Sequence, residues 1–271
     1  MYKLIAIDLD GTLLTDELTI TPRTIQAIQK AVELGTVVTI ATGRMYPSAK
    51  QFAQQLGINV PVITYQGAII KEIASNEVIY ERLIPADIAQ KLVDIAKEKN
   101  LHLQVYQDDI LYGTVENDKL IAYAKKSKVP YQVEPDFSKL AKNGFTKALF
   151  IEESDDLDAL QDELQGLFGE RAHISKSAVN YLEVTHPEAN KGSALLHLAS
   201  KLGIDRTETI GIGDNHNDIE LIETAGLGVA MGNAVQALKD IADYTSLSNN
   251  EEGVCHTIEK FVLEPMGAII E

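Results

Sequence analysis

The sequence predicts an α/β protein with a Rossmann-like parallel-sheet core and an inserted α+β domain. Near both ends of the 271-residue chain, apolar strand patterns alternate with helix patterns, which is typical of a parallel sheet with right-handed crossovers. In the middle, strand pairs separated by turns indicate an antiparallel sheet instead. We therefore expect a first core segment over 1–82, an inserted domain over 83–184 and a second core segment over 185–271.

The first core segment begins with the apolar run KLIAID at 3–8, a pattern typical of a strand buried on both faces. A helix is expected to begin after Thr21, with Pro22 at its first position, and to end at Gly35. Residues 36–41 (TVVTIA) then predict a second strand.

The remaining elements follow the same reasoning. In the inserted domain we expect a helix at 85–99, two strands meeting at the Asp108-Asp109 turn, a strand at 147–153 and two short strands around Asn180. In the core we expect a helix ending near Gly57, strands at 61–67, 207–214 and 227–231, and helices ending at Leu202, spanning 216–225, starting near Val235 and spanning 251–263 before Pro265.

The composition predicts a globular cytoplasmic protein, with 45% hydrophobic and 24% charged residues. No apolar run reaches the length of a membrane span, and the N-terminus lacks the pattern of a signal peptide. The only cysteine, Cys255, excludes an intrachain disulfide and is expected to be a small buried apolar residue.

The net charge of −16, without any cluster of Lys and Arg, disfavours nucleic acid as a partner. A small anionic substrate stays compatible with this charge if its site is locally positive or holds a metal. The sequence does not fix the oligomeric state.

Polar residues follow the predicted strands where each strand ends. Asp8 and Asp10 follow the first strand, residues 42–44 (TGR) follow the second, and 213–218 (GDNHND) follow a later one. Lys191 lies near the start of the helix that precedes this later strand. Because ligands bind at the carboxyl ends of the strands in doubly wound sheets, we expect one pocket to collect these residues.

Four aspartates in one pocket require compensation of their charge. If Asp8, Asp10, Asp214 and Asp218 converge, each adjacent pair about 4 Å apart repels by roughly 4 kcal/mol at an effective dielectric of 20. A divalent cation would remove this cost, and oxygen ligands favour magnesium. His216 lies inside the acidic motif, but a single imidazole does not make a zinc site.

The motifs DLDGT at 8–12, TGR at 42–44, Lys191 and GDNHND at 213–218 resemble the four ordered motifs of the haloacid dehalogenase superfamily. D-x-D-G-T alone is expected by chance on the order of 0.003 times in such a chain. The insertion between the second and third motifs resembles the Cof-type branch, whose α+β cap domain covers the active site. Three further segments match that branch: TYQGA at 64–68, NKG at 190–192 and GVAMGNA at 228–234.

The resemblance implies a reaction and a role for each motif residue. Asp8 would attack phosphorus to form an aspartyl-phosphate, and Asp10 would act as general acid and base. Magnesium would be held by Asp8, the backbone carbonyl of Asp10 and Asp214, while Asp218 would orient Lys191 or a magnesium-bound water. The residues implied to bind the substrate phosphate are Leu9, Thr42, Gly43, Lys191 and Asn217.

We therefore expect a magnesium-dependent phosphatase of small phosphomonoesters such as sugar phosphates. Superfamily dehalogenases lack the second aspartate, so Asp10 favours phosphoryl transfer. Two alternatives stay open: a phosphosugar mutase that uses the same aspartyl-phosphate, and a noncatalytic sugar-phosphate sensor. Pure binding does not need the acid/base Asp10, which argues against the sensor. The tail EPMGAIIE at 264–271 departs from the branch and carries no implied role.

Overall fold

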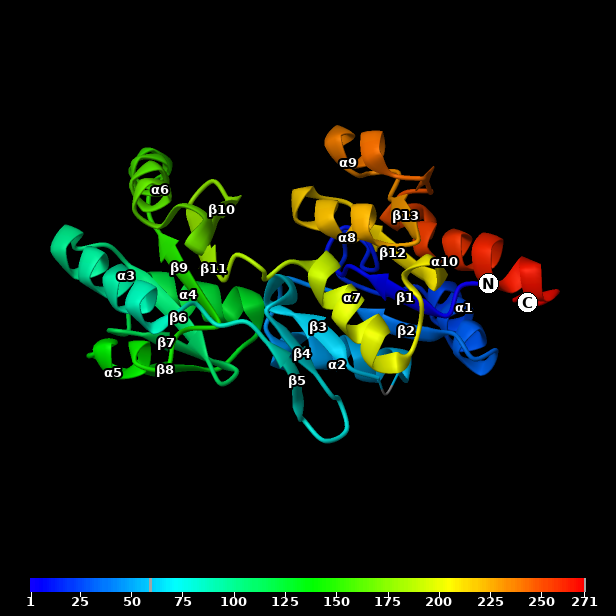
Figure 1. Ribbon diagram of the computed structural model, residues 1–271, viewed down its shortest axis with the longest axis horizontal. Coiled ribbons are helices and arrows are strands. Elements are labelled where there is room, and N and C mark those ends of the chain that lie inside the picture. Colours follow the sequence, from blue (N-terminus) through cyan, green and yellow to red (C-terminus); the bar gives the residue numbers. More distant parts are fainter. Residues whose placement is uncertain (59, 271) are drawn as a thin grey trace. The chain divides into compact units, whose positions relative to one another are not determined.

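The computed structural model describes residues 1–58 and 60–270. The chain forms two compact units, a core unit of Met1–Tyr80 with Asn190–Glu271 and an inserted unit of Glu81–Ala189 (Figure 1). The second border lies five residues beyond the expected position after 184. Glu188 pairs with Arg82 at 2.8 Å, and this contact joins the segment after the last strand of the inserted unit to that unit's first residues.

The core unit contains a parallel sheet of five strands within the described residues, in the order β14-β13-β12-β1-β2. β1 lies inside the sheet, between β12 and β2, and every residue in it is buried, as the continuous apolar run predicted. The α/β fold class with a parallel core sheet is thereby confirmed. The strands are β1 (Leu4–Ile7), β2 (Val37–Ile40), β12 (Thr209–Gly213), β13 (Leu227–Ala230) and β14 (Tyr244–Thr245).

The core helices begin and end where the sequence carries capping residues. The Thr21 side chain accepts a hydrogen bond from the Thr24 amide at the start of α1, and Gly57 ends α2 in a left-handed conformation. The helices are α1 (Pro22–Glu33), α2 (Tyr46–Leu56), α7 (Lys191–Leu202), α8 (Ile219–Thr224), α9 (Gln236–Ile241) and α10 (Gly253–Ile258), with 3₁₀ turns at Arg206–Glu208, His216–Asp218 and Asn249–Glu251.

The last helix differs from the expected 251–263. After α10 the backbone continues as a π-helix over Glu259–Leu263 and a 3₁₀ turn over Glu264–Met266. Pro265 lies in the first turn of this last segment, where a missing amide hydrogen costs nothing. The helical path therefore runs through the proline instead of stopping before it.

The expected third strand at 61–67 is wrong in its second half. β3 (Val62–Thr64) meets the end of β2 through a parallel bridge between Ala41 and Ile63, but the chain then turns at Tyr65–Gly67. This turn returns the chain into a small sheet of order β3-β4-β5, with β4 at Ile69–Lys71 and β5 at Val78–Glu81. The turn brings residues 65–67 back to the end of β2.

The inserted unit contains a sheet of order β10-β11-β9-β6-β7-β8, whose pairs are antiparallel except β7 with β8. The expected antiparallel pairing is confirmed for the other strands, and the one parallel pair at this edge arises because α4 connects β7 to β8 as a crossover. The elements are α3 (Ala86–Lys99), β6 (Leu103–Gln107), β7 (Ile110–Gly113), α4 (Asp118–Ser127), β8 (Tyr131–Val133), α5 (Ser138–Ala141), β9 (Lys147–Ile151), α6 (Ser154–Phe168), a 3₁₀ turn at Gly169–Arg171, β10 (His173–Ala178) and β11 (Tyr181–Thr185).

Each unit buries apolar side chains of its own. In the inserted unit, Val105 and Phe150 of the sheet pack with Leu92 of α3 and Leu160 of α6 in one cluster. None of the helices in the described part of the chain is long and apolar enough to cross a bilayer.

Candidate active site

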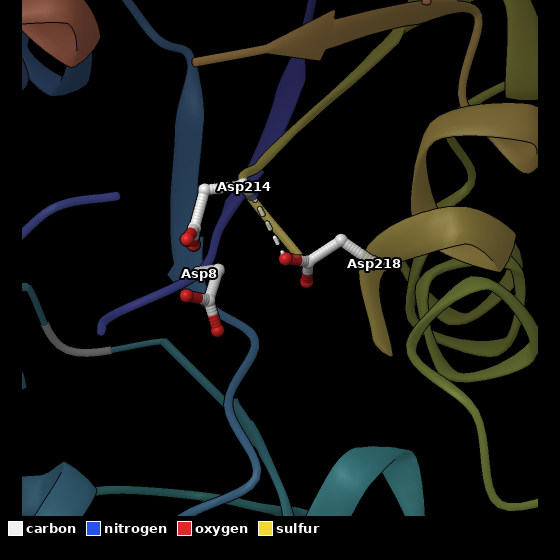
Figure 2. Close-up of side chains that lie close together, drawn as sticks. All are labelled: Asp8, Asp214 and Asp218. Carbon is white, nitrogen blue, oxygen red and sulfur yellow. Dashed lines mark hydrogen bonds between the residues drawn. The ribbon is translucent and has the colours of Figure 1, made fainter. Parts of the chain in front are cut away.

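Three acidic side chains gather at the carboxyl edge of the core sheet. Asp8 follows β1, Asp214 follows β12, and Asp218 ends the 3₁₀ turn after β12. One carboxylate oxygen of each lies within 4.8 Å of those of the other two, and Figure 2 shows the three side chains close together. The parallel sheet therefore brings the first and last motifs together, as the strand ends predicted.

Lys191 lies fully buried beside this cluster, at the first position of α7. Its Nζ donates to Asp8 Oδ1 at 2.5 Å and to Asp218 Oδ1 at 2.6 Å. Burial alone would lower the pKa of Lys191, but the Asp218 and Asp8 carboxylates raise the pKa above its ordinary value. The ammonium group is thus held charged between two carboxylates.

Asp8 and Asp214 carry more negative charge than Lys191 compensates. Burial raises the pKa of Asp8 well above its ordinary value, despite the nearby Lys191. Burial also raises the pKa of Asp214 to about 6, although Thr12 Oγ1 donates to its Oδ1 at 2.9 Å. The oxygens of these two desolvated carboxylates are ligands that fit a divalent cation such as Mg²⁺.

Asp218 differs from the other two aspartates because both of its oxygens already accept protein hydrogen bonds. Oδ1 accepts from Lys191, and Oδ2 accepts from the amides of Asp214 at 3.0 Å and Asn215 at 3.1 Å. Asp218 therefore contacts Lys191 with one oxygen and the backbone of its own loop with the other. His216 of the same loop is exposed and lies outside the acidic cluster.

The Asp10 side chain is not part of the cluster that the other three carboxylates form. Arg44 Nε donates to Asp10 Oδ2 at 2.8 Å, and Arg44 Nη2 donates to Oδ1 at 2.6 Å. This bidentate pair holds the Asp10 carboxylate half exposed, with 52% of the side chain accessible. Arg44 thereby acquires a role that the sequence alone did not assign.

The glycines of two motifs allow close approach. Gly11 has φ +79°, and a Cβ there would lie 2.5 Å from Asp214 Oδ2. A Cβ at Gly43 would overlap with the side-chain amide of Gln66. A side chain at Gly11 would therefore displace Asp214 and strain the backbone, and one at Gly43 would displace Gln66.

The expected phosphate-binding residues line the same sheet edge. Thr42 is buried and its Oγ1 accepts the Arg44 amide at 3.1 Å. The Leu9 side chain is fully buried, so that only its backbone can contact a ligand. Asn217 is exposed, and its Nδ2 donates to Gln66 Oε1 at 3.0 Å.

Sequence reasoning missed Thr12, Arg44 and Gln66 as site residues. Thr12 and Arg44 lie inside the recognised motifs, so their positions were visible although their partners were not. Gln66 lies in TYQGA, where the only signal was the match to a family segment.

Comparison with known proteins gives the family of this chain. Residues 5–258 match the haloacid dehalogenase-like hydrolase family. The HMP-PP phosphatase of Serratia proteamaculans is 32% identical over 98% of this chain and 97% of its own length. The 5-amino-6-(5-phospho-D-ribitylamino)uracil phosphatase YitU of Bacillus subtilis is 31% identical over 95% of this chain and 97% of its own.

Among solved structures, TM0651 from Thermotoga maritima is similar with a TM-score of 0.89 and 36% identity, covering 96% of this chain and 98% of that chain. Both units therefore have counterparts in a known structure. The resemblance carried by the motifs, and the phosphatase activity expected from it, are confirmed. The chain belongs to the haloacid dehalogenase-like hydrolase family and is a Cof-type phosphatase with an inserted cap domain.

Proposed function

We propose that this phosphatase hydrolyses small phosphorylated metabolites, sugar phosphates foremost, in a magnesium-dependent reaction through an aspartyl-phosphate on Asp8. The observation that carries the proposal is the buried Asp8 carboxylate at the end of β1, held by Lys191 and adjacent to Asp214. The named activities of the two relatives, on HMP-PP and on a phosphoribitylamino-uracil, support a small phosphorylated substrate.

In the proposed reaction, Asp8 supplies the nucleophile and Asp10 moves the protons. A carboxylate oxygen of Asp8 attacks phosphorus while the bond from phosphorus to the leaving oxygen breaks, and protonated Asp10 gives its proton to that oxygen. Asp10 then takes a proton from a water that attacks the acyl phosphate, releasing phosphate and restoring Asp8. In the structure both Asp10 oxygens accept from Arg44, so the proposed transfers require one of these two hydrogen bonds to be released when substrate binds.

The cation and the phosphate would use separate groups of the same edge. Asp8, the backbone carbonyl of Asp10 and Asp214 would hold Mg²⁺, which neutralises charge developing on the phosphoryl oxygens when it is bound. Asp218 would keep Lys191 in place through the 2.6 Å bond. The groups proposed to bind phosphate are the backbone of Leu9, Thr42, Gly43, Lys191 and Asn217.

A phosphate-release screen with added Mg²⁺ over sugar phosphates, nucleotides and cofactor phosphates tests the proposal. The expected result is release of inorganic phosphate that chelation abolishes and that an Asp8→Asn preparation lacks. Transfer of phosphate between positions of one sugar, without release, would support the mutase instead. Substrate binding without turnover would support the sensor.

A further inference from the structure

The turn at Tyr65–Gly67 has an unusual backbone for its residue types. Tyr65 has φ 52°, Gln66 φ 61° and Gly67 φ 97°, so two residues with side chains adopt the left-handed region in succession. Each such residue costs about 1–2 kcal/mol. Strain of this kind persists only where surrounding contacts enforce it, and it concentrates at functional sites.

Contacts with the residues after β2 enforce the conformation. The Tyr65 amide donates to the Arg44 carbonyl at 3.0 Å, and the Gln66 amide donates to the Thr42 carbonyl at 3.1 Å. Gly67 packs against the start of α7, because a Cβ there would overlap with the Asn190 carbonyl oxygen. The turn is therefore fixed between the TGR motif and the residue that precedes Lys191.

This conformation places the Gln66 side chain beside two groups proposed to bind phosphate. Its amide lies so close to Gly43 that a methyl group on Gly43 would overlap with it, and its Oε1 accepts from Asn217 Nδ2 at 3.0 Å. Gln66 is only half-buried. Its Nε2 donates to no protein atom in the described part of the chain, so a hydrogen-bond donor is left available beside Gly43.

We propose that Gln66 is a further phosphate-binding residue, whose Oε1 holds Asn217 and whose Nε2 donates to a phosphoryl oxygen of the substrate. A carboxamide suits this position because it accepts and donates within one side chain. It also adds a donor without adding positive charge to a site that already holds Lys191. The inference rests on the proposed function, because it assumes that the phosphoryl group lies at Gly43.

Two substitutions separate this role from a purely structural one. Gln66→Glu keeps the length and the acceptor for Asn217 but replaces the donor with a negative charge. Gln66→Met removes donor and acceptor without adding charge. Gln55→Glu is the matched control, because Gln55 is exposed on α2 and the change in net charge is the same.

The test is calorimetric binding of inorganic phosphate to the full chain with Mg²⁺, together with kcat and KM for an aryl phosphate. We expect Gln66→Glu to raise both the Kd of inorganic phosphate and the KM of the aryl phosphate at least tenfold. Gln66→Met should raise the same two constants at least threefold. Gln55→Glu should bind like the wild type. Wild-type phosphate affinity in both folded Gln66 variants would overturn the inference.

An Asn217→Ala background isolates the donor. If Nε2 contacts phosphate itself, Gln66→Met weakens phosphate binding further in this background. No further weakening would mean that Gln66 acts only through Asn217, which overturns the proposed contact. Failure of the proposed function has a different signature, because wild-type protein would then neither bind inorganic phosphate nor release it from any ester.

Discussion

Asp8 combines a stability cost with the proposed chemistry. Its carboxylate is buried, and Lys191 offsets only part of the desolvation that raises its pKa. A carboxyl group whose pKa is raised by folding is harder to ionise in the folded state, so it lowers the free energy of unfolding at neutral pH, above its unfolded pKa. The folded chain thus keeps its proposed nucleophile in a position where burial of the charge lowers stability.

The first prediction concerns this residue. Asp8→Asn should reduce turnover at least a thousandfold, because the amide lacks the attacking charge, while its oxygen can still accept from Lys191. The Tm of the metal-free variant should equal or exceed that of the wild type, since a buried charge is removed. Phosphate release and thermal melts measure the two effects, with mass spectrometry to exclude deamidation. Turnover within tenfold of wild type contradicts the assignment.

A second residue-scale prediction concerns Cys255, which the sequence indicated as a small buried residue and which is 1% exposed in α10. Burial, with Glu259 nearby, raises the pKa of the Cys255 thiol to about 12. Because only the thiolate reacts, native protein should resist iodoacetamide between pH 7 and 9, whereas guanidinium-unfolded protein should react fully. Rapid stoichiometric alkylation of native protein at pH 8 would disprove this.

At the scale of elements, the turn at Tyr65–Gly67 connects motifs that are far apart in the sequence. Gly67→Ala adds a methyl group that overlaps with the Asn190 carbonyl at a left-handed φ. We expect a loss of about 3 kcal/mol from strain and overpacking together, with reduced activity from displacement of α7. Denaturant melts and phosphate release measure both effects.

Gly203→Ala is the matched control for this prediction. Gly203 ends α7 with φ +67°, but a Cβ there meets no atom within 4 Å. Its substitution should cost only the left-handed conformation, about 1 kcal/mol, without loss of activity. Equal losses in the two variants would show that conformation alone, and not contact with Asn190, matters at Gly67.

The sequence predicted the elements wherever periodicity and caps were clear, and failed where a tertiary contact decides. The alternation of strands and helices predicted the parallel core, and the strand ends predicted that Asp8 and Asp214 meet beside Lys191 at the start of α7. The segment at 61–67 looked like one strand because its left-handed residues are Tyr and Gln, which carry no turn signal. The parallel pairing of β8 with β7 could not be predicted, because β8 has only three residues (YQV) and shows no clear strand pattern.

Side-chain partners were the least predictable part of the site. Asp10 was expected among the other carboxylates, but its position depends on the bidentate pair with Arg44, 34 residues away. No local pattern encodes that choice. Likewise, Asp218 Oδ2 accepts hydrogen bonds from two backbone amides, and the direction of these amides is set only by the folded loop.

For the whole molecule, the net charge of −16 means that a bound cation reduces repulsion between negative charges in the folded chain and thereby stabilises it. When Mg²⁺ is added to chelator-treated protein, the Tm should rise, because the cation compensates the charge of the desolvated Asp8 and Asp214 carboxylates. A Mg²⁺ concentration of 100 times its Kd would add about 2.7 kcal/mol to the free energy of unfolding. Differential scanning fluorimetry measures the shift. The Asp214→Asn variant should lose it, and an equal shift in that variant would place the cation elsewhere.

The division into two units allows a final test of where catalysis lies. Asp8, Asp10, Lys191 and Asp214 all belong to the core unit, whose sheet and helices bury their own apolar cluster. The inserted unit likewise buries its own cluster. The chemistry should therefore need the core unit alone, and preference among natural leaving groups should need the inserted unit.

Replacing residues 82–188 with a Gly/Ser linker should preserve slow, magnesium-dependent hydrolysis of an aryl phosphate while removing preference among natural substrates. Circular dichroism and a cooperative melt establish first that the shortened chain folds, and the same chain with Asp8→Asn supplies the inactive control. A folded core with wild-type discrimination would place specificity in the core unit. A folded core without hydrolysis would show that a residue of the inserted unit takes part in the chemistry, because every group assigned to the reaction would still be present.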